Sequence, residues 1–477
     1  MRVMVINPPR VDRCTVVREE RFEHRDVGSC YPPLSHLHVA GALEAAGHDV
    51  RLLDANGLDL SLEDVRRHMD EFRPEAVFAR VAFDCQREDT QLLRYARETH
   101  GAITLTRCKI IAEADFVLEA FLREFAFLDL FFLAEPDAVI VAALAALREG
   151  RPKSEIPGVA WLADGAIRRT ALPEPESDLD RLPRPAWHLL PSLSPYHTGV
   201  LEAPFAVVQT TRGCPFGCAF CAYRRNRIRY HSPKRVVEEL RMLKDKFGLR
   251  SFLLFDDVVG LDEQRFMRIL DGIIEARLDL QWACCTRANL LTRDAARRMK
   301  EAGCVEVAVG IESGDPEVLE RTGKKITLDQ VREASKICRE NGLLFYAMCI
   351  IGLPGETRES VKRTCRFLRD IRPFYTQVCF STPLPNTPNF AWYKENSYLL
   401  TEDWSRYSSL YPHPVVRTEA LSADDLSELR RWIYRRMLLR PGWWLSQIRP
   451  FDWRWNLRGA RKLAGRILAL ARKDAVR

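Results

Sequence analysis

The sequence lacks any long apolar run that is free of charged residues. Its most apolar stretch, residues 116–147, is interrupted by Glu119, Arg123, Glu124, Asp129, Glu135, Pro136 and Asp137, whereas a membrane-spanning helix needs roughly 20 apolar residues in succession. The start, MRVMVINPPR, holds no apolar core of the length that a secretion signal requires. We therefore expect no transmembrane segment and a cytoplasmic protein, whose thiols stay reduced and free to bind metal.

The sequence also lacks an excess of positive charge outside its C-terminal end. The net charge of the 477 residues is +7, but residues 440–477 alone carry +8, which leaves about −1 for the rest of the chain. A protein that binds nucleic acid usually presents a basic face. The charge distribution therefore predicts no nucleic-acid partner.

The order of elements predicts an α/β fold with more than one domain. Residues 1–150 alternate short apolar runs with helical patterns, as in a Rossmann-like parallel sheet with helices on both faces. Residues 151–200 are rich in proline and contain one hairpin signal at Asp164-Gly165, which indicates a linker. Residues 201–400 resume the alternation with six strand–helix units, which predicts a partial (β/α)6 barrel. Residues 401–477 are expected to form a helical region with a basic tail.

Three cysteines stand close together at the end of the first strand of the predicted barrel. Cys214, Cys218 and Cys221 lie in the segment GCPFGCAFC. Cysteine clusters of this kind are typical of metal sites. A structural zinc site would need a fourth ligand, and the chain has no second C-x2-C pair to supply it. The pattern therefore favours a metal site that keeps one position open.

The cysteine segment resembles the motif of the radical S-adenosylmethionine (SAM) superfamily, C-x3-C-x-aromatic-C, with Phe220 as its aromatic residue. The resemblance implies that the three thiolates bind a 4Fe-4S cluster and that the open iron receives SAM. The family cleaves SAM reductively to a 5′-deoxyadenosyl radical, so an electron donor such as flavodoxin or ferredoxin is an expected partner.

The resemblance extends to the other strand ends of the predicted barrel. It implies contacts of SAM with these residues: Phe220 near the adenine, Asp256 or Asp257 on the ammonium group, Arg287 on the carboxylate, Glu312 and Ser313 at the ribose, and Gly352 and Gly355 along the adenine. Substrate binding and proton transfer also need acids. The candidates for catalysis are Asp256, Asp257 and Glu312, followed by Asp315 and Glu356. The sequence leaves open which carboxylates serve SAM and which serve the substrate.

The first domain is similar to that of radical SAM enzymes with an N-terminal cobalamin-binding domain. In that subgroup, glycine-rich turns follow the later strands, but here the corresponding place contains Arg107, Cys108 and Lys109. Side chains at these positions hinder the close approach of a corrin ring or its nucleotide tail to the backbone. The sequence therefore favours a retained fold without its cofactor, with cobalamin binding as the alternative.

These features lead to two enzymatic hypotheses. The main one is radical dehydration of a vicinal diol, because the altered loops are similar to the radical SAM diol-dehydratases of aminoglycoside antibiotic biosynthesis, which act on paromamine together with an NADPH-dependent reductase. The alternative is a cobalamin-dependent radical SAM C-methyltransferase of secondary metabolism. An iron–sulfur electron carrier would not need the SAM-contact segments, and a tRNA methylthiotransferase would need a basic RNA-binding module.

The end of the chain contains a basic amphipathic pattern over residues 458–477. It fits either a helix docked on the barrel with a solvated basic face, which we favour, or a contact with a membrane surface or a partner.

Overall fold

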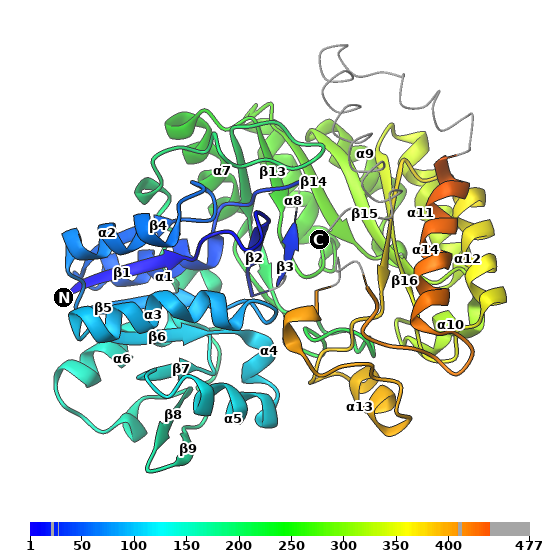
Figure 1. Cartoon of the computed structure of the whole chain (residues 1–477). Coiled ribbons are helices and arrows are strands. Elements are labelled where there is room, and N and C mark those ends of the chain that lie inside the picture. The colour runs from blue at the N-terminus through cyan, green and yellow to red at the C-terminus, as the bar shows by residue number, and fades with distance from the viewer. Residues whose placement is uncertain (21–22, 27, 409–412, 439–477) are drawn as a thin grey trace. The chain divides into compact units, whose positions relative to one another are not determined.

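The structure is a computed structural model, and it describes residues 1–20, 23–26, 28–408 and 413–438 (Figure 1). The chain divides into two compact units. The first comprises Met1–Tyr196 and Arg229–Ser232, and the second comprises His197–Ile228 and Pro233–Arg477. The basic pattern at residues 458–477 lies outside the described residues.

The first unit is built on a seven-stranded sheet. Its strand order is β4 (Asp49–Asp54), β1 (Arg2–Asn7), β5 (Ala76–Arg80), β6 (Ile103–Arg107), β7 (Leu130–Phe132), β8 (Val159–Ala163) and β9 (Ala166–Arg169). The strands from β4 to β7 are parallel, and β1 and β5 are almost wholly buried, as expected for strands covered on both faces.

Helices cover both faces of this sheet. The crossover rule places α1 (Leu34–Ala45) and α3 (Gln86–His100) on opposite faces, because the chain turns one way from β1 to β4 and the other way from β5 to β6. α6 (Pro136–Arg148) packs beside α1, and α2 (Leu62–Phe72) packs beside α3. α2 begins at Ser61, whose side chain forms a capping box with Asp64. The short α4 (Lys109–Ala112) and α5 (Asp115–Glu124) precede β7.

The segment predicted as a linker is partly built into the first sheet. The hairpin expected at Asp164-Gly165 is formed by β8 and β9, with Ala163 opposite Ala166. β8 also pairs antiparallel with β7, so the hairpin extends the sheet. The proline-rich pattern predicts loops in this segment. It does not reveal that β8 pairs with β7, which would otherwise be an exposed edge of the sheet.

The second unit contains the six parallel strands that the sequence predicts. Their order is β10 (Phe205–Val208), β13 (Ser251–Leu254), β14 (Gln281–Thr286), β15 (Cys304–Glu312), β16 (Leu344–Ile351) and β17 (Tyr375–Phe380). Neighbours along the sheet are also neighbours along the chain, which is the arrangement of a partial barrel. The connecting helices form one outer layer (Figure 1): α7 (Pro233–Phe247), α8 (Glu263–Glu275), α9 (Arg293–Glu301), α11 (Leu328–Glu340) and α12 (Arg358–Ile371). The unit also contains α10 (Pro316–Arg321), α13 (Pro388–Glu395) and α14 (Ala423–Leu438).

The two faces of the barrel strands differ in burial. On β16, alternate residues such as Phe345 and Ala347 are buried toward the helices, whereas Tyr346 and Met348 on the other face keep partial exposure. β17 repeats the alternation. Since successive side chains of a strand point to opposite faces, the inner face of the barrel remains within reach of solvent.

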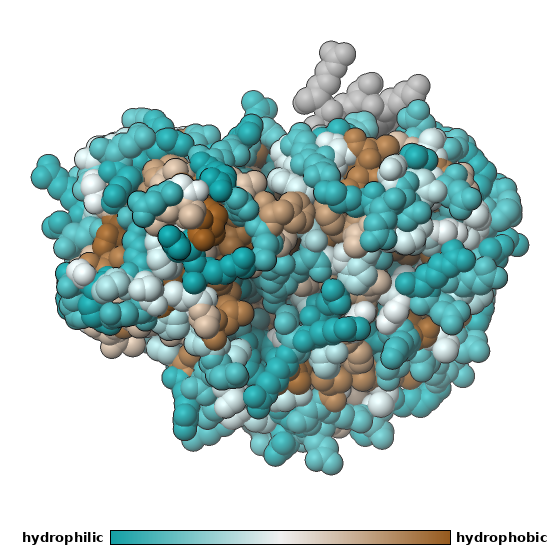
Figure 2. All heavy atoms as spheres, turned by 90° about the horizontal axis from the view of Figure 1, so that it is seen from below, coloured by the Kyte–Doolittle hydropathy of each residue, from teal (hydrophilic) through white to brown (hydrophobic). Residues whose placement is uncertain are grey.

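Few large apolar side chains lie on the surface. Among the described residues, only Phe116, Leu172 and Leu400 are exposed large hydrophobic residues. Figure 2 accordingly shows mostly hydrophilic residues on the face that it presents, with small apolar areas between them. Within the described residues, no helix combines the length and the apolar character that crossing a membrane requires.

Gly303, which precedes β15, provides a test of how the barrel strands are positioned. Its φ is +92°, and a Cβ there would lie 2.1 Å from the carbonyl oxygen of Leu280. We expect Gly303→Ala to lower the stability of the protein by at least about 3 kcal/mol, because backbone strain and a backbone clash add. The control is Gly248→Ala, where φ is +63° and nothing lies within 4 Å, so strain alone acts and the loss is about 1–2 kcal/mol. Urea unfolding midpoints of the two variants measure the difference, and equal midpoints would contradict the account.

Candidate active site

The cysteine loop follows β10 and is fixed by its backbone. The amide of Ala219 donates to the carbonyl of Thr322 at 2.8 Å, and the amide of Asn389 donates to the carbonyl of Ala219 at 3.1 Å. Within the loop, the amide of Asn226 donates to the carbonyl of Cys214 at 2.8 Å. These bonds hold a segment without regular structure in one conformation, so the three thiols are presented from a defined loop.

Gly213 allows the loop to leave the sheet. Its φ is +98°, and a Cβ would lie 2.2 Å from the carbonyl oxygen of Arg227. Its amide donates to Oδ2 of Asp257 at 2.8 Å. Only glycine fits this conformation and this close approach of backbone. The residue before Cys214 therefore has a structural role that the cysteine motif alone does not reveal.

The thiols fit the chemistry of an iron–sulfur cluster as a donor set. Cys218 is buried, and Cys214 and Cys221 are partly buried. Burial raises the pKa of Cys214, and it raises the pKa of Cys221 to about 12. Such thiols become thiolates only when a cation binds them. Thiolate sulfur is the ligand that iron–sulfur clusters take. Within the described part of the chain, no three metal-binding side chains already converge at bonding distance.

Arg287 supplies positive charge beside the thiols. It follows β14, and its Nη1 lies 3.7 Å from Sγ of Cys218. Its Nη2 donates to the carbonyl of Lys324. The guanidinium lies over the ring of Phe216, 3.7 Å from the ring centroid. The sequence analysis predicts Phe220 as the aromatic residue of this site. It does not predict Phe216, which lies in the same loop.

The two adjacent aspartates after β13 occupy different environments. Asp256 is 1% exposed and accepts hydrogen bonds from the amide and hydroxyl of Thr210, at 2.5 Å each, and from the amide of Thr211 at 2.9 Å. Burial raises its pKa, which these hydrogen bonds partly offset. Asp257 is only partly buried and contacts the cysteine loop through Gly213. Asp256 thus ties the end of β10 to the end of β13, and Asp257 faces the loop.

Glu312 forms a buried ion pair at the end of β15. Its carboxylate contacts Nζ of Lys324, and both side chains are 8% exposed. Nζ also donates to the carbonyl of Gly310 at 2.6 Å. A Cβ on Gly310 would lie 2.3 Å from Oε1 of Glu312, so glycine leaves room for the carboxylate. The φ of Glu312 is +60°, an uncommon conformation for a residue with a side chain. The sequence analysis does not predict a role for Lys324. The only sequence signal that could have indicated one is its position in the GKK segment after α10.

The other predicted residues are used in part by the fold itself. The hydroxyl of Ser313 lies 3.2 Å from that of Thr364 on α12. Asp315 caps α10 and pairs with Arg363. These two side chains therefore have partners in the helix layer, where they stabilise the turn that follows Glu312.

The turn after β16 contains a second buried carboxyl. Gly352 and Gly355 both have positive φ, and the amide of Gly352 donates to Oε2 of Glu356. The hydroxyl of Tyr393 donates to the carbonyl of Gly352. Burial raises the pKa of Glu356 to about 8. At neutral pH this carboxyl is therefore protonated, which suits a role within the turn.

The raised pKa of Glu356 predicts a pH dependence of stability. The folded state holds this proton up to about pH 8, whereas the ordinary value is 4.5. The stabilisation is complete below the ordinary pKa and is lost as the pH rises through the folded value. We expect Glu356→Gln to flatten part of the fall in unfolding midpoint between about pH 5 and pH 8. Thermal unfolding across this range measures it, with exposed Glu317→Gln as the control. An unchanged slope in Glu356→Gln would contradict the assignment.

Comparisons with known proteins place the chain in a family. The family model described as the radical SAM superfamily matches residues 208–368. A protein of Pyrococcus horikoshii named as an uncharacterized methyltransferase is 30% identical over 444 residues, which cover 92% of this chain and 93% of the relative. The anaerobic magnesium-protoporphyrin IX monomethyl ester cyclase of Rubrivivax gelatinosus is 26% identical over 425 residues, with 87% and 75% covered.

A solved structure shares the fold of most of the chain. It is the radical S-adenosylmethionine methyltransferase TsrM from Kitasatospora setae with cobalamin and a 4Fe-4S cluster bound. It matches with a TM-score of 0.69 and 18% identity, and covers 92% of this chain and 89% of the other. The names of these relatives favour the alternative hypothesis of methyl transfer over the dehydration that the altered loops suggest. The chain belongs to the radical SAM superfamily, and it shares the fold of a member that binds cobalamin.

Proposed function

We propose that this enzyme uses SAM to transfer a methyl group to a carbon atom of a small organic substrate. The observation that carries the proposal is the relative named as a methyltransferase, which is 30% identical along almost the whole chain. The strand-end residues of the second unit support it, because a methyltransferase of this superfamily needs a site for a cluster and for SAM at one edge of the barrel.

Cys214, Cys218 and Cys221 would hold the 4Fe-4S cluster. When bound, the cluster supplies the electron that cleaves the sulfonium bond of SAM. Arg287 contributes a positive charge next to these ligands, which lowers the electrostatic cost of gathering three thiolates. The same guanidinium is our candidate for the SAM carboxylate, since a planar donor pair suits a carboxylate.

The contacts of the two aspartates suggest a division of their roles. Asp256 already accepts three hydrogen bonds and is enclosed by the ends of β10 and β13. We therefore assign the SAM ammonium to Asp257, which is partly exposed beside the cysteine loop. Asp256 is then a positioning residue.

Glu312 is our candidate for the ribose hydroxyls of SAM. A carboxylate accepts two hydroxyl donors well, and the ion pair with Lys324 fixes its orientation. Gly352 and Gly355 are candidates for backbone contacts with the adenine, and Phe220 for packing against it. We further propose an electron donor of the flavodoxin or ferredoxin class as partner.

Radical dehydration of a vicinal diol is the second candidate, and one observation favours it. Arg107 is the last residue of β6, next to the turn where a cobalamin domain has glycines, and its guanidinium donates to the carbonyls of Phe132 and Leu133. Without a corrin, hydrogen abstraction followed by loss of a neighbouring hydroxyl is a simpler outcome of the radical. A substrate such as paromamine, with an NADPH-dependent reductase acting on the product, belongs to this candidate.

The cysteine ligands can be tested by iron content. We expect anaerobically reconstituted protein to hold about four iron atoms per chain, and Cys218→Ser to hold almost none and to lose all SAM cleavage. Cys338→Ser is the control, because this buried cysteine lies on α11, outside the loop. Full iron content in Cys218→Ser would remove that residue from the ligand set.

The reaction type can be tested by the fate of SAM. The reconstituted enzyme is incubated with paromamine deuterated on carbon, with SAM labelled in its methyl group, and with a chemical reductant. Methyl transfer gives a labelled methyl group on the product together with S-adenosylhomocysteine. Dehydration gives deuterated 5′-deoxyadenosine without S-adenosylhomocysteine. The first result supports the main proposal and the second supports the other. If neither a labelled product nor deuterated 5′-deoxyadenosine forms, paromamine is excluded as substrate for both reactions.

A further inference from the structure

A hairpin that the sequence does not predict lies at the ligand-binding edge of the first unit. β2 (Thr15–Arg18) and β3 (Glu23–Asp26) pair antiparallel, with Arg18 opposite Glu23. The hairpin is inserted between β1 and α1. In open parallel sheets, ligands bind outside the carboxyl ends of the strands, where neighbouring strands are followed by helices on opposite faces. Here that position lies between β1 and β5.

Arg18 fills this position with its guanidinium. The side chain is fully buried and uses all five of its N–H donors. Three of them reach Oδ1 of Asn7 at 3.2 Å and the carbonyls of Pro8 and Pro9 at 2.9 Å each, just after β1. The other two bind the carboxylate of Asp89 at 2.8 and 2.7 Å.

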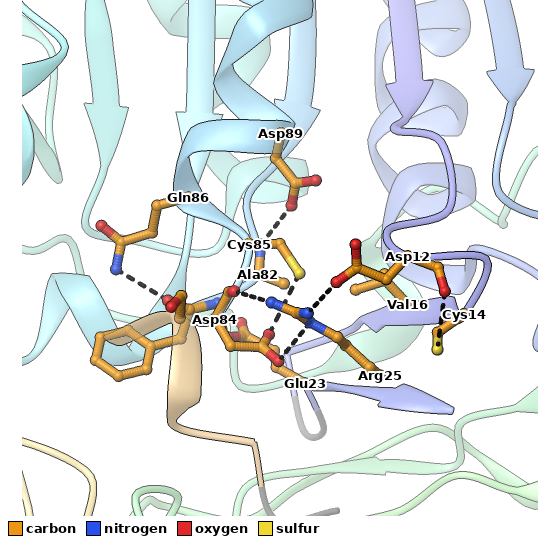
Figure 3. Close-up of polar contacts among 12 residues, drawn as sticks. Asp12, Cys14, Val16, Glu23, Arg25, Ala82, Asp84, Cys85, Gln86 and Asp89 are labelled. Atoms are coloured by element: carbon orange, nitrogen blue, oxygen red, sulfur yellow. Dashed lines mark hydrogen bonds and ion pairs between the residues drawn. The ribbon is translucent and has the colours of Figure 1, made fainter. Parts of the chain in front are cut away.

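Asp89 connects this arginine to the next strand. It lies in the first turn of α3, and its Oδ2 also accepts the amide of Ala82, just after β5, at 2.9 Å. Figure 3 shows this contact together with neighbouring ones. Arg18 and Asp89 thus use the polar groups at the ends of both strands that a ligand would contact.

The acidic residues of the hairpin neutralise two further arginines at the same edge. Arg80 ends β5 and Arg107 ends β6. Glu20 pairs with Arg80, and it accepts from Nε and Nη2 of Arg107 at 2.8 and 3.1 Å. Glu23 lies 3.6 Å from Arg80. It also accepts the amide of Phe83 at 3.1 Å.

The outer side of the hairpin is attached as well. Arg25 binds Asp12 at 2.9 Å, and it contacts both the carboxylate of Asp84 at 3.3 Å and its carbonyl at 2.9 Å (Figure 3). Beneath these charges, a small apolar cluster joins the hairpin to the loop after β5. It consists of Val11, Val16, Ala82 and Cys85.

These contacts do not fit cobalamin at this edge. The nucleotide tail of a corrin would have to displace Arg18 and leave Asp89 without its partner. Breaking a buried ion pair by removing one partner is strongly destabilising, because the other charge stays buried without compensation. At the end of β6, Arg107 and Cys108 stand where glycines would let a ligand approach, and both are buried. The edge is therefore already occupied by side chains whose charges are paired.

We infer that the β2–β3 hairpin permanently replaces the ligand of this domain, and that the chain does not bind cobalamin there. The inference does not rest on the proposed function. It restricts the proposed function. Any methyl group that the enzyme transfers would come from SAM without being carried by a corrin on the way. It applies equally to dehydration.

The first experiment measures cobalamin uptake directly. Full-length protein with its cluster reconstituted is incubated anaerobically with excess hydroxocobalamin and desalted, and the visible spectrum and extracted cobalamin are measured. TsrM from Kitasatospora setae is the positive control. We expect no stoichiometric uptake by the wild type, while its iron content and its SAM cleavage show that the protein is folded. One cobalamin per chain would overturn the inference. Cobalamin uptake and SAM cleavage are measured separately. A protein that fails to cleave SAM would therefore contradict the proposed function without bearing on this inference.

The second experiment tests whether the hairpin holds the edge. Hydrogen exchange is followed by mass spectrometry in the wild type, in Arg18→Lys and in Arg25→Lys. Lysine keeps the charge but cannot make five bonds. We expect a large loss of protection at the ends of β1 and β5 in Arg18→Lys and a small loss in Arg25→Lys, whose side chain is 17% exposed. Cobalamin should leave the wild-type pattern unchanged. Equal effects of the two variants, or protection of this edge by cobalamin, would overturn the inference.

Discussion

The buried carboxylate of Asp256 is the interaction on which the candidate active site depends. It accepts the backbone amides of Thr210 and Thr211 and so fixes where β10 ends. The cysteine loop begins directly afterwards at Gly213, whose amide is held by the neighbouring Asp257. Two successive carboxylates thus fix the start of a loop that has no regular structure of its own. The loop then carries the thiols to the place that Arg287 reaches from the end of β14.

The two units use the same edge of a parallel sheet in opposite ways. In the second unit, the strand ends present thiols, a guanidinium and a carboxylate, and the inner strand face remains partly exposed. In the first unit, the corresponding edge is filled by Arg18, Arg80 and Arg107 with their acidic partners. Burying so many charges is tolerable because each has a partner of opposite charge, although Nε and Nη2 of Arg80 donate no hydrogen bond. The chain therefore shares its fold with a cobalamin-binding structure without sharing the cofactor.

The sequence predicts the six barrel strands and the cysteine loop, because apolar runs and cysteine spacing are local signals. It cannot separate Asp256 from Asp257, since only the structure shows which neighbour is enclosed by strand ends. Lys324 is twelve residues from Glu312, and nothing local indicates their pairing. The β2–β3 hairpin is missed for a similar reason. Its segment is dense in charge, a pattern typical of solvated loops, and these charges are buried only because their partners come from other elements, Asp89 from α3 and Arg80 from β5.

The hairpin also limits what the first unit can contribute to chemistry. A radical enzyme with a corrin has two sources of reactive groups, one on each sheet edge. Here the first edge contains paired charges, so our candidates for binding a cofactor all lie in the second unit. Whether the enzyme transfers a methyl group or removes water then depends on which groups lie next to the substrate radical. With a neighbouring hydroxyl and an acid to protonate it, the radical loses water. Methyl transfer from a second SAM needs one further electron, which the proposed flavodoxin or ferredoxin would supply, so that S-adenosylhomocysteine can leave.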